Sequence, residues 1–135
     1  MNANAQELVT RLRKSRSMEI KIGNITFYGT CPLYSTCLSI INKCAKTGDA
    51  ADVELVLRAI TGWNGVTEAD LFNDGDSNEI VDFDKDLFNE VIRDRHDWWV
   101  PISARITESI YERQIKKETE IKNSAAGTTN EHLSA

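Results

Sequence analysis

The side chains that could do nucleophilic or metal chemistry are few: Cys31, Cys37, Cys44, His96 and His132. A cysteine enzyme would need a histidine within hydrogen-bond reach of its thiol. His96 lies between charges in RDRHDWW, where a surface or helix-junction histidine is expected, and His132 lies in a polar tail. The odd cysteine count and the absence of a CxxC pair argue against a disulfide framework or a structural zinc site. We therefore predict that the chain is not an enzyme, and keep a Cys–His enzyme as a rival hypothesis.

The segment NDGDSNEIVDFD is rich enough in carboxylates to be tested as a calcium loop. An EF-hand loop requires oxygen ligands at positions 1, 3, 5 and 12 and glycine at position 6. With Gly75 at position 6, Phe72 takes position 3 and Val81 takes position 12. With Ile80 at position 8, Asn78 takes the glycine position. Neither register fits calcium, so we predict a solvated acidic turn, no metal and no cofactor.

The charge is distributed unevenly along the chain. The net charge is −5, yet residues 68–97 hold eleven acids and three bases, a local net of −8. The other end carries a short basic cluster, which we interpret as a solvated helix end: Arg11, Arg13, Lys14 and Arg16. Phosphate repulsion by the acidic segment disfavours nucleic acid as the main partner. The apolar runs are too short to span a membrane and no signal-peptide core is visible, so a cytoplasmic protein is expected.

The length of 135 residues predicts one domain that is large enough for its own core. We predict an N-terminal helix or arm at residues 1–17, a single helical domain at 18–122 and a disordered tail at 123–135. The tail, NSAAGTTNEHLSA, has one large apolar residue and no periodicity, so it offers too little surface to bury.

The sequence MEIKIGNITFY predicts a β-hairpin at 18–29, because two alternating runs flank a two-residue Gly-Asn turn. That turn places Ile22 opposite Ile25 and Ile20 opposite Phe27, so one face of the hairpin is apolar. An isolated hairpin is marginal in water, and this face must therefore lie against helices. The expected fold is mainly α: a small helical domain with an N-terminal β-hairpin packed on helices.

Apolar spacing and capping residues predict the remaining elements. Cys37 and Cys44 are seven residues apart and share a helix face, where we expect them as small buried hydrophobes. Tyr34, Leu38 and Ile41 form a second stripe beside them, so this helix is predicted to be mostly buried. Helical segments are predicted at 30–47, 49–62, 67–72 and 84–95, and from residue 97 or 101 to about 121.

Trp63 lies between Gly62 and Gly65, at the predicted end of a helix. We expect the glycines to allow a sharp turn there, and the indole to pack across the junction between helix pairs in a structural role. Phe83 precedes the cap of the next helix and Phe88 lies one turn inside it, a spacing that predicts a hydrophobic staple.

Aromatic residues near the last predicted helix exceed what one small core should need, so some are expected in an exposed patch. Acidic side chains of the middle segment would frame that patch and speed the encounter with a basic or amphipathic helix. The predicted partner-binding residues are Phe72, Trp98, Trp99, Tyr111, Asp74 and Asp76.

The order of motifs in the second half of the chain carries a family resemblance. An apolar helix ends in ITGWNGV, an acidic Asp-Gly turn follows, and VDFDKDLFNEVI precedes a long final helix with a charged end. This layout resembles the tail assembly chaperones of long-tailed, siphovirus-type phages and prophages. The resemblance covers about residues 50–123, and its most specific element is WNGV at 63–66. The stretch from Val66 to Phe83 is longer than in the family pattern, and no proline-aromatic pair follows the glycine turn.

The resemblance implies a protein without catalytic activity that acts in the host cytoplasm. It implies binding of the tape measure protein, a long helical and aggregation-prone chain that the chaperone keeps soluble while tail tube subunits assemble. It also implies a longer, frameshifted product whose extension recruits the tail tube protein. Self-association into a homo-oligomer is left open. The alternative hypothesis is a small acidic phage-encoded inhibitor that acts as a nucleic-acid mimic on a host protein.

Overall fold

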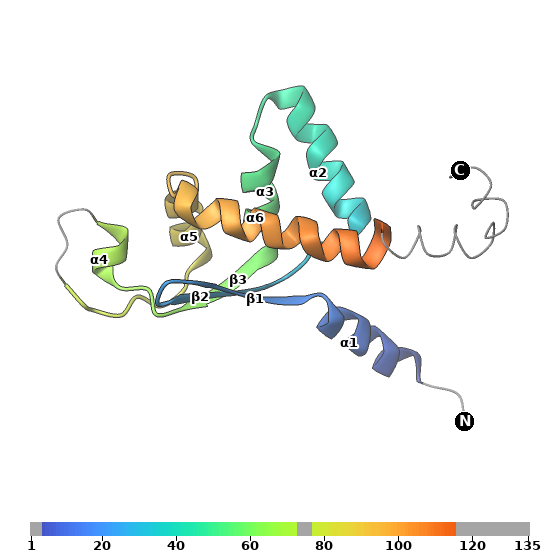
Figure 1. Cartoon of the computed structure of the whole chain (residues 1–135), viewed down its shortest axis with the longest axis horizontal. Helices are drawn as coiled ribbons and strands as arrows, with labels where there is room; N and C mark the ends of the chain where they lie inside the picture. Colours follow the sequence, from blue (N-terminus) through green and yellow to red (C-terminus); the bar gives the residue numbers. More distant parts are fainter. Residues whose placement is uncertain (1–3, 73–76, 116–135) are drawn as a thin grey trace, which may run out of the picture.

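The computed structural model describes residues 4–72 and 77–115 (Figure 1). Over these residues the fold is mainly helical, with one three-stranded antiparallel sheet in the order β1-β2-β3. The elements are α1 Ala5–Ser15, β1 Ser17–Ile22, β2 Ile25–Thr30, α2 Tyr34–Thr47, α3 Ala51–Ala59, β3 Ile60–Asn64, α4 Glu68–Leu71, α5 Lys85–Ile92, α6 His96–Ile110 and the π-helical turn η1 Tyr111–Ile115. The predicted tail and the predicted partner residues Asp74 and Asp76 lie outside the described residues.

The sheet and the helices form two layers with the core between them. In Figure 1 the sheet runs along the lower side of the molecule, α6 lies lengthwise above it, and α2 and α3 rise beyond α6. α6 contacts α3, α5 and β1, so it connects the two layers. The helices α1 and α4 extend at opposite ends of the molecule (Figure 1).

The hairpin forms in the predicted register. Ile20 lies opposite Phe27 and Ile22 lies opposite Ile25, and Gly23 takes a positive φ of 60° in the turn. A positive φ in this turn matches the right-handed twist of the two strands. The apolar face of the hairpin is directed into the core, with Phe27 fully buried.

Residues 60–64 form a strand, although their spacing predicted a helix through residue 62. α3 ends at Ala59, and Ile60 takes extended angles, φ −83° and ψ 129°. β3 then pairs with β2, so that Trp63 lies opposite Phe27. The edge of β2 carries backbone groups that need hydrogen-bond partners, and β3 supplies them. Periodicity within the segment could not reveal this, because the partner strand lies far earlier in the chain.

Two glycines are required by close backbone approaches. Gly65 has a φ of 87°, and a Cβ atom there would lie 2.3 Å from the Asn24 carbonyl oxygen. A Cβ atom on Gly29 would lie 2.2 Å from the Ala59 carbonyl oxygen, where β2 passes the end of α3. Gly62 lies inside β3 with open space beside it, so the sharp turn expected at both flanking glycines is found only at Gly65.

Five aromatic rings meet where the sheet faces α5 and α6, and we call this cluster the aromatic junction: Phe27, Trp63, Phe83, Phe88 and Trp98. The ring centroid of Trp63 lies 5.2 Å from that of Phe83, and that of Phe27 lies 5.2 Å from that of Trp98, both edge-to-face. Such pairs contribute about 0.5–1.5 kcal/mol each beyond the area they bury. Trp63 is 8% exposed, and its Nε1–H donates to the Val81 carbonyl oxygen at 2.8 Å.

Local capping positions the helices around this junction. Asp84 accepts a hydrogen bond at 3.0 Å from the backbone N–H three residues later, and α5 begins directly after it. The rings of Phe83 and Phe88 are 5.6 Å apart, which confirms the predicted hydrophobic staple. Asp70 accepts from the backbone N–H of Thr67 at 2.8 Å, so the single turn of α4 also begins where its capping residues predicted.

α2 buries one of its two apolar stripes. Cys37 and Cys44 are buried, as predicted, whereas Tyr34, Leu38 and Ile41 are exposed. The prediction of a mostly buried helix is therefore wrong. The physical reason is that α3 packs against the side of α2 that carries Cys37 and Cys44, while the opposite side remains exposed.

Candidate protein-binding site

α1 carries an apolar stripe that contributes nothing to the core. Leu8, Val9 and Leu12 are 40%, 43% and 59% exposed, and no residue of the helix is buried. The Asn4 side chain accepts from the Gln6 backbone N–H at 2.8 Å, so the first turn is capped locally. An amphipathic helix with its apolar side in solvent is suited to pairing with another chain.

The residue that directly precedes α2, Leu33, lies near this stripe and is exposed. A hollow of about 450 Å³ is lined by Leu12 of α1, Leu33 and residues 112–114 of η1. Leu12 and Leu33 therefore border one concave surface, whereas the exposed stripe of α2 lies on a different side of that helix from the α2 residues that line the hollows.

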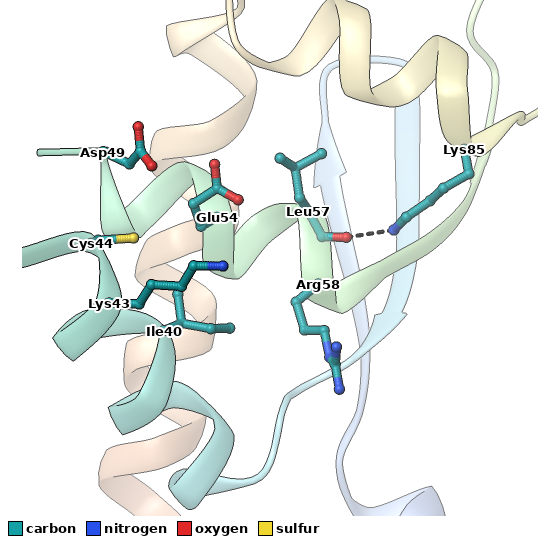
Figure 2. Close-up of a pocket in the computed structure, with 8 residues that line it drawn as sticks. All are labelled: Ile40, Lys43, Cys44, Asp49, Glu54, Leu57, Arg58 and Lys85. Atoms are coloured by element: carbon teal, nitrogen blue, oxygen red, sulfur yellow. Dashed lines mark hydrogen bonds between the residues drawn. The ribbon is translucent and has the colours of Figure 1, made fainter. Parts of the chain in front are cut away.

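Two more hollows continue from this one. The central hollow, of about 230 Å³, shares Arg16 and Leu33 with the first and adds Thr30, Thr36 and Arg58. The third hollow, of about 530 Å³, shares Arg58 and lies between α2 and α3 (Figure 2). We call the three adjoining hollows the basic groove.

The charges in the third hollow are mostly engaged. Lys85 donates to the carbonyl oxygens of Leu57 and Ile60 at the end of α3, the latter at 2.9 Å (Figure 2). Burial, together with the nearby Arg58, lowers the pKa of the Lys85 amine. Because these carbonyl oxygens lie at the negative end of the helix dipole, Lys85 acts as a structural cap for α3.

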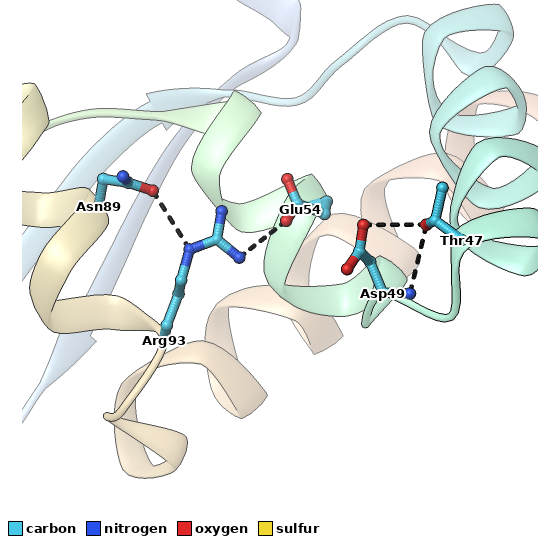
Figure 3. Close-up of polar contacts among 5 residues, drawn as sticks. All are labelled: Thr47, Asp49, Glu54, Asn89 and Arg93. Carbon is cyan, nitrogen blue, oxygen red and sulfur yellow. Dashed lines mark hydrogen bonds and ion pairs between the residues drawn. The ribbon is translucent and has the colours of Figure 1, made fainter.

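The carboxylates of the third hollow also have partners. Glu54 accepts from Arg93 Nη1 at 2.9 Å, and Arg93 Nε donates to Asn89 at 3.3 Å (Figure 3). Asp49 accepts from the Thr47 hydroxyl at 2.9 Å (Figure 3). These pairings organise the α2–α3 connection and the contact between α3 and α5.

The predicted partner-binding aromatics do not form one patch. Phe72 is exposed at the end of α4. Trp98 is 1% exposed, with the Arg95 guanidinium 3.9 Å from its ring centroid, so it belongs to the core and cannot be a surface anchor. Trp99 is half-buried, because adjacent helix positions point about 100° apart. Tyr111 is exposed, but it follows Trp99 by twelve residues, roughly 18 Å along a helix.

Several carboxylates of the acidic segment, residues 68–97, stabilise local structure. Asp70 and Asp84 cap α4 and α5. Asp97 accepts from Arg95 at 2.9 Å through each oxygen, and these hydrogen bonds lower the pKa of the Asp97 carboxyl. Other carboxylates of this segment are exposed on and around α5: Asp82, Asp86, Glu90 and Asp94.

The thiols and His96 do not form a nucleophile–base pair in the described residues. Cys31 Sγ lies 3.8 Å from the Ile106 carbonyl oxygen, whereas His96 begins α6 ten residues earlier, roughly 15 Å away along the helix. Burial is the main cause that raises the pKa of both Cys37 and Cys44, and a reactive cysteine needs the opposite shift. Within residues 4–72 and 77–115, no three His, Cys, Asp or Glu side chains gather into a metal site.

The sequence analysis did not predict the exposed apolar stripe of α1 or the basic groove. It interpreted the basic cluster as a solvated helix end, although Leu8 and Leu12 lie four residues apart on the same short helix. That spacing beside several cations was the available signal for an interaction helix. No signal in the sequence could place Arg58 beside Arg16, because they come from different elements.

None of the helices in the described ranges combines the length and the apolar character needed to cross a bilayer. Comparisons with protein-family models, with curated proteins and with solved structures gave no match.

Proposed function

We propose that the chain is a tail assembly chaperone of a long-tailed phage or prophage. It binds the tape measure protein, keeps it soluble and helps the tail tube to assemble on it. The observation that carries this proposal is α1, an amphipathic helix whose stripe of Leu8, Val9 and Leu12 is exposed and unused by the core. A protein that holds a helical, aggregation-prone chain needs exposed apolar helix faces of this kind.

The second support is the exposed stripe of α2, Tyr34, Leu38 and Ile41. Two exposed apolar helix faces offer two separate surfaces for the apolar side chains of a helical partner. The proposal includes action in the host cytoplasm, and a longer frameshifted product that recruits the tail tube protein. Those parts rest on the sequence resemblance alone.

One rival function has its own observation. Carboxylates such as Asp82 and Asp86 are exposed around α5, as a nucleic-acid mimic that inhibits a host protein would require. The two functions use different chemistry: the inhibitor would bind through carboxylates, whereas the chaperone binds through apolar side chains. Substitutions that remove one kind of contact therefore separate them.

The deciding experiment is co-expression with the tape measure protein encoded beside this chain, with its soluble fraction as the readout. We expect a Leu8→Ser, Leu12→Ser variant to lose most of the solubilising effect. The matched control is Gln6→Ser with Thr10→Ser, on the opposite side of α1, which should behave as the parent chain. Equal solubility with both variants, or without the chain, would reject the proposal. Loss of function only in an Asp82→Asn, Asp86→Asn variant would favour the inhibitor.

A further inference from the structure

We propose that the basic groove recognises carboxylates on its partner, through Arg16 and Arg58, and that the partner segment is an acidic amphipathic helix. The inference deepens the proposed function and rests on it for the identity of the partner. It differs from the sequence-based prediction, in which the acidic segment favoured a basic or amphipathic helix as partner.

Arg16 is held in place while part of its guanidinium group lacks a partner. Its backbone N–H donates to Arg13 at 3.1 Å, and its carbonyl oxygen accepts from Cys31 at 2.7 Å. Its Nε is buried and has no hydrogen-bond partner among the described residues. A buried donor without a partner lowers stability, so a shift of the Arg16 side chain that brings its guanidinium group to an acceptor on a ligand in the hollow would be favourable.

Arg58 extends from the last turn of α3 into the same central hollow. Figure 2 shows its guanidinium group turned away from both Lys85 and Glu54. Within the described residues, no carboxylate pairs with Arg58, and no carboxylate lines the central hollow. Two arginines with the hydroxyls of Thr30 and Thr36 are a suitable set of donors for a carboxylate.

The groove is better suited to a protein helix than to nucleic acid. The arginines are flanked by two exposed apolar residues, Leu12 and Leu33. Leucines of a partner helix would cover these residues while a neighbouring Glu or Asp reaches the arginines. Glu112 and Glu54 line the two outer hollows, so negative charge on a ligand is favoured only at the central hollow, and this suits a single carboxylate of a helix better than a continuous phosphate backbone.

The test uses two synthetic helical peptides of about 20 residues, long enough for stable helix, with the same leucine stripe and either Glu or Lys beside it. Fluorescence anisotropy with the full chain measures their affinities. We expect the Glu peptide to bind more tightly and to weaken as salt rises. Arg16→Met and Arg58→Met should each lower its affinity about tenfold to a hundredfold, the range for hydrogen bonds to charged groups.

The matched control is Arg11→Met, which removes the same charge from an exposed position of α1 outside the three hollows. It should change the affinity less than about threefold, as expected for a solvent-screened charge. Thermal unfolding gives a second readout: Arg16→Met should keep or raise the melting temperature, because it removes an unpartnered buried donor. A lowered melting temperature would assign Arg16 a structural role and overturn the proposal.

Further results of the binding experiments would identify a different ligand for the groove. Equal binding of the Lys peptide, or displacement of the Glu peptide by a DNA duplex at equal concentration, would overturn the acidic-helix assignment. Sedimentation that shows self-association released by the Glu peptide would assign the groove to a second copy of the chain instead. If the arginines select the Glu peptide but the tape measure protein is not solubilised, the groove assignment stands and the proposed function fails. If the tape measure protein is solubilised without any charge preference, only the present inference fails.

Discussion

The aromatic junction and the helices α1 and α2 both carry large apolar side chains, which are buried at the junction and exposed on the two helices. At the junction, Trp63 is almost completely buried among four other rings, with its polar atom hydrogen-bonded. On α1 and α2, large apolar side chains at helical spacing remain exposed. The difference lies in whether another described element of the chain covers the apolar side. Residues that stabilise the fold and residues available for a partner are therefore separated in space.

The largest expected effect is at the centre of the junction. Trp63→Ala should destabilise the fold by about 3–5 kcal/mol, because it leaves a cavity among four rings and frees the Val81 carbonyl oxygen. Chemical denaturation monitored by circular dichroism measures the change. Phe72→Ala, at an exposed aromatic, is the control and should change stability by about 0.5 kcal/mol or less. Equal denaturation midpoints for Trp63→Ala and Phe72→Ala would contradict the assignment of Trp63 to the buried core and of Phe72 to the surface.

The glycines that flank Trp63 give the next test. Gly65→Ala should cost about 1–3 kcal/mol, since the new Cβ atom meets the Asn24 carbonyl oxygen and the backbone has a positive φ. Gly62→Ala should remain within about 0.5 kcal/mol of the parent chain, because the space beside it is open. A comparison of denaturation midpoints suffices, and the reverse order would show that the turn lies before Trp63.

A smaller effect is expected at the helix that presents Phe88 to the junction. Asp84→Ala removes the cap of α5 and should cost about 1 kcal/mol, within the usual range for this change. Asp82→Ala removes an exposed carboxylate of the same segment and serves as the control. Thermal unfolding at pH 7 compares them. An equal loss of thermal stability in Asp84→Ala and Asp82→Ala would mean that removing a negative charge, and not removing the helix cap, explains the result.

The smallest effect on stability should accompany a large effect on binding. Leu38→Ala and Ile41→Ala, on the exposed stripe of α2, should each change the free energy of unfolding by about 0.5 kcal/mol or less. Both should reduce the soluble fraction of the co-expressed tape measure protein, and the nearby exposed Ser39→Ala should not. If these variants strongly destabilised the chain but still solubilised the tape measure protein, the stripe would have a role in folding, like the aromatic junction, and not in binding.

Local signals carried much of the fold prediction. The hairpin register followed from the length of its turn, and the start of α5 followed from Asp84, Phe83 and Phe88. Both features depend on residues within a few positions of one another, and local backbone geometry restricts the conformations that these residues can adopt. The candidate site was predicted less well, since Trp98 proved to be a core residue and the exposed stripe of α2 was expected to be buried.

The sequence by itself determined where helices and the hairpin occur, which side of each is apolar, and that charge is divided between a basic N-terminal cluster and an acidic middle. Tertiary structure decided that residues 60–64 pair with β2 as a strand, because only the free edge of β2 makes an extended conformation favourable there. Tertiary structure also decided which of the two apolar stripes of α2 is covered, and it brought Arg16 and Arg58 to the lining of the same hollow. Burial and charge proximity depend on contacts between distant segments, and no periodicity within one segment specifies them.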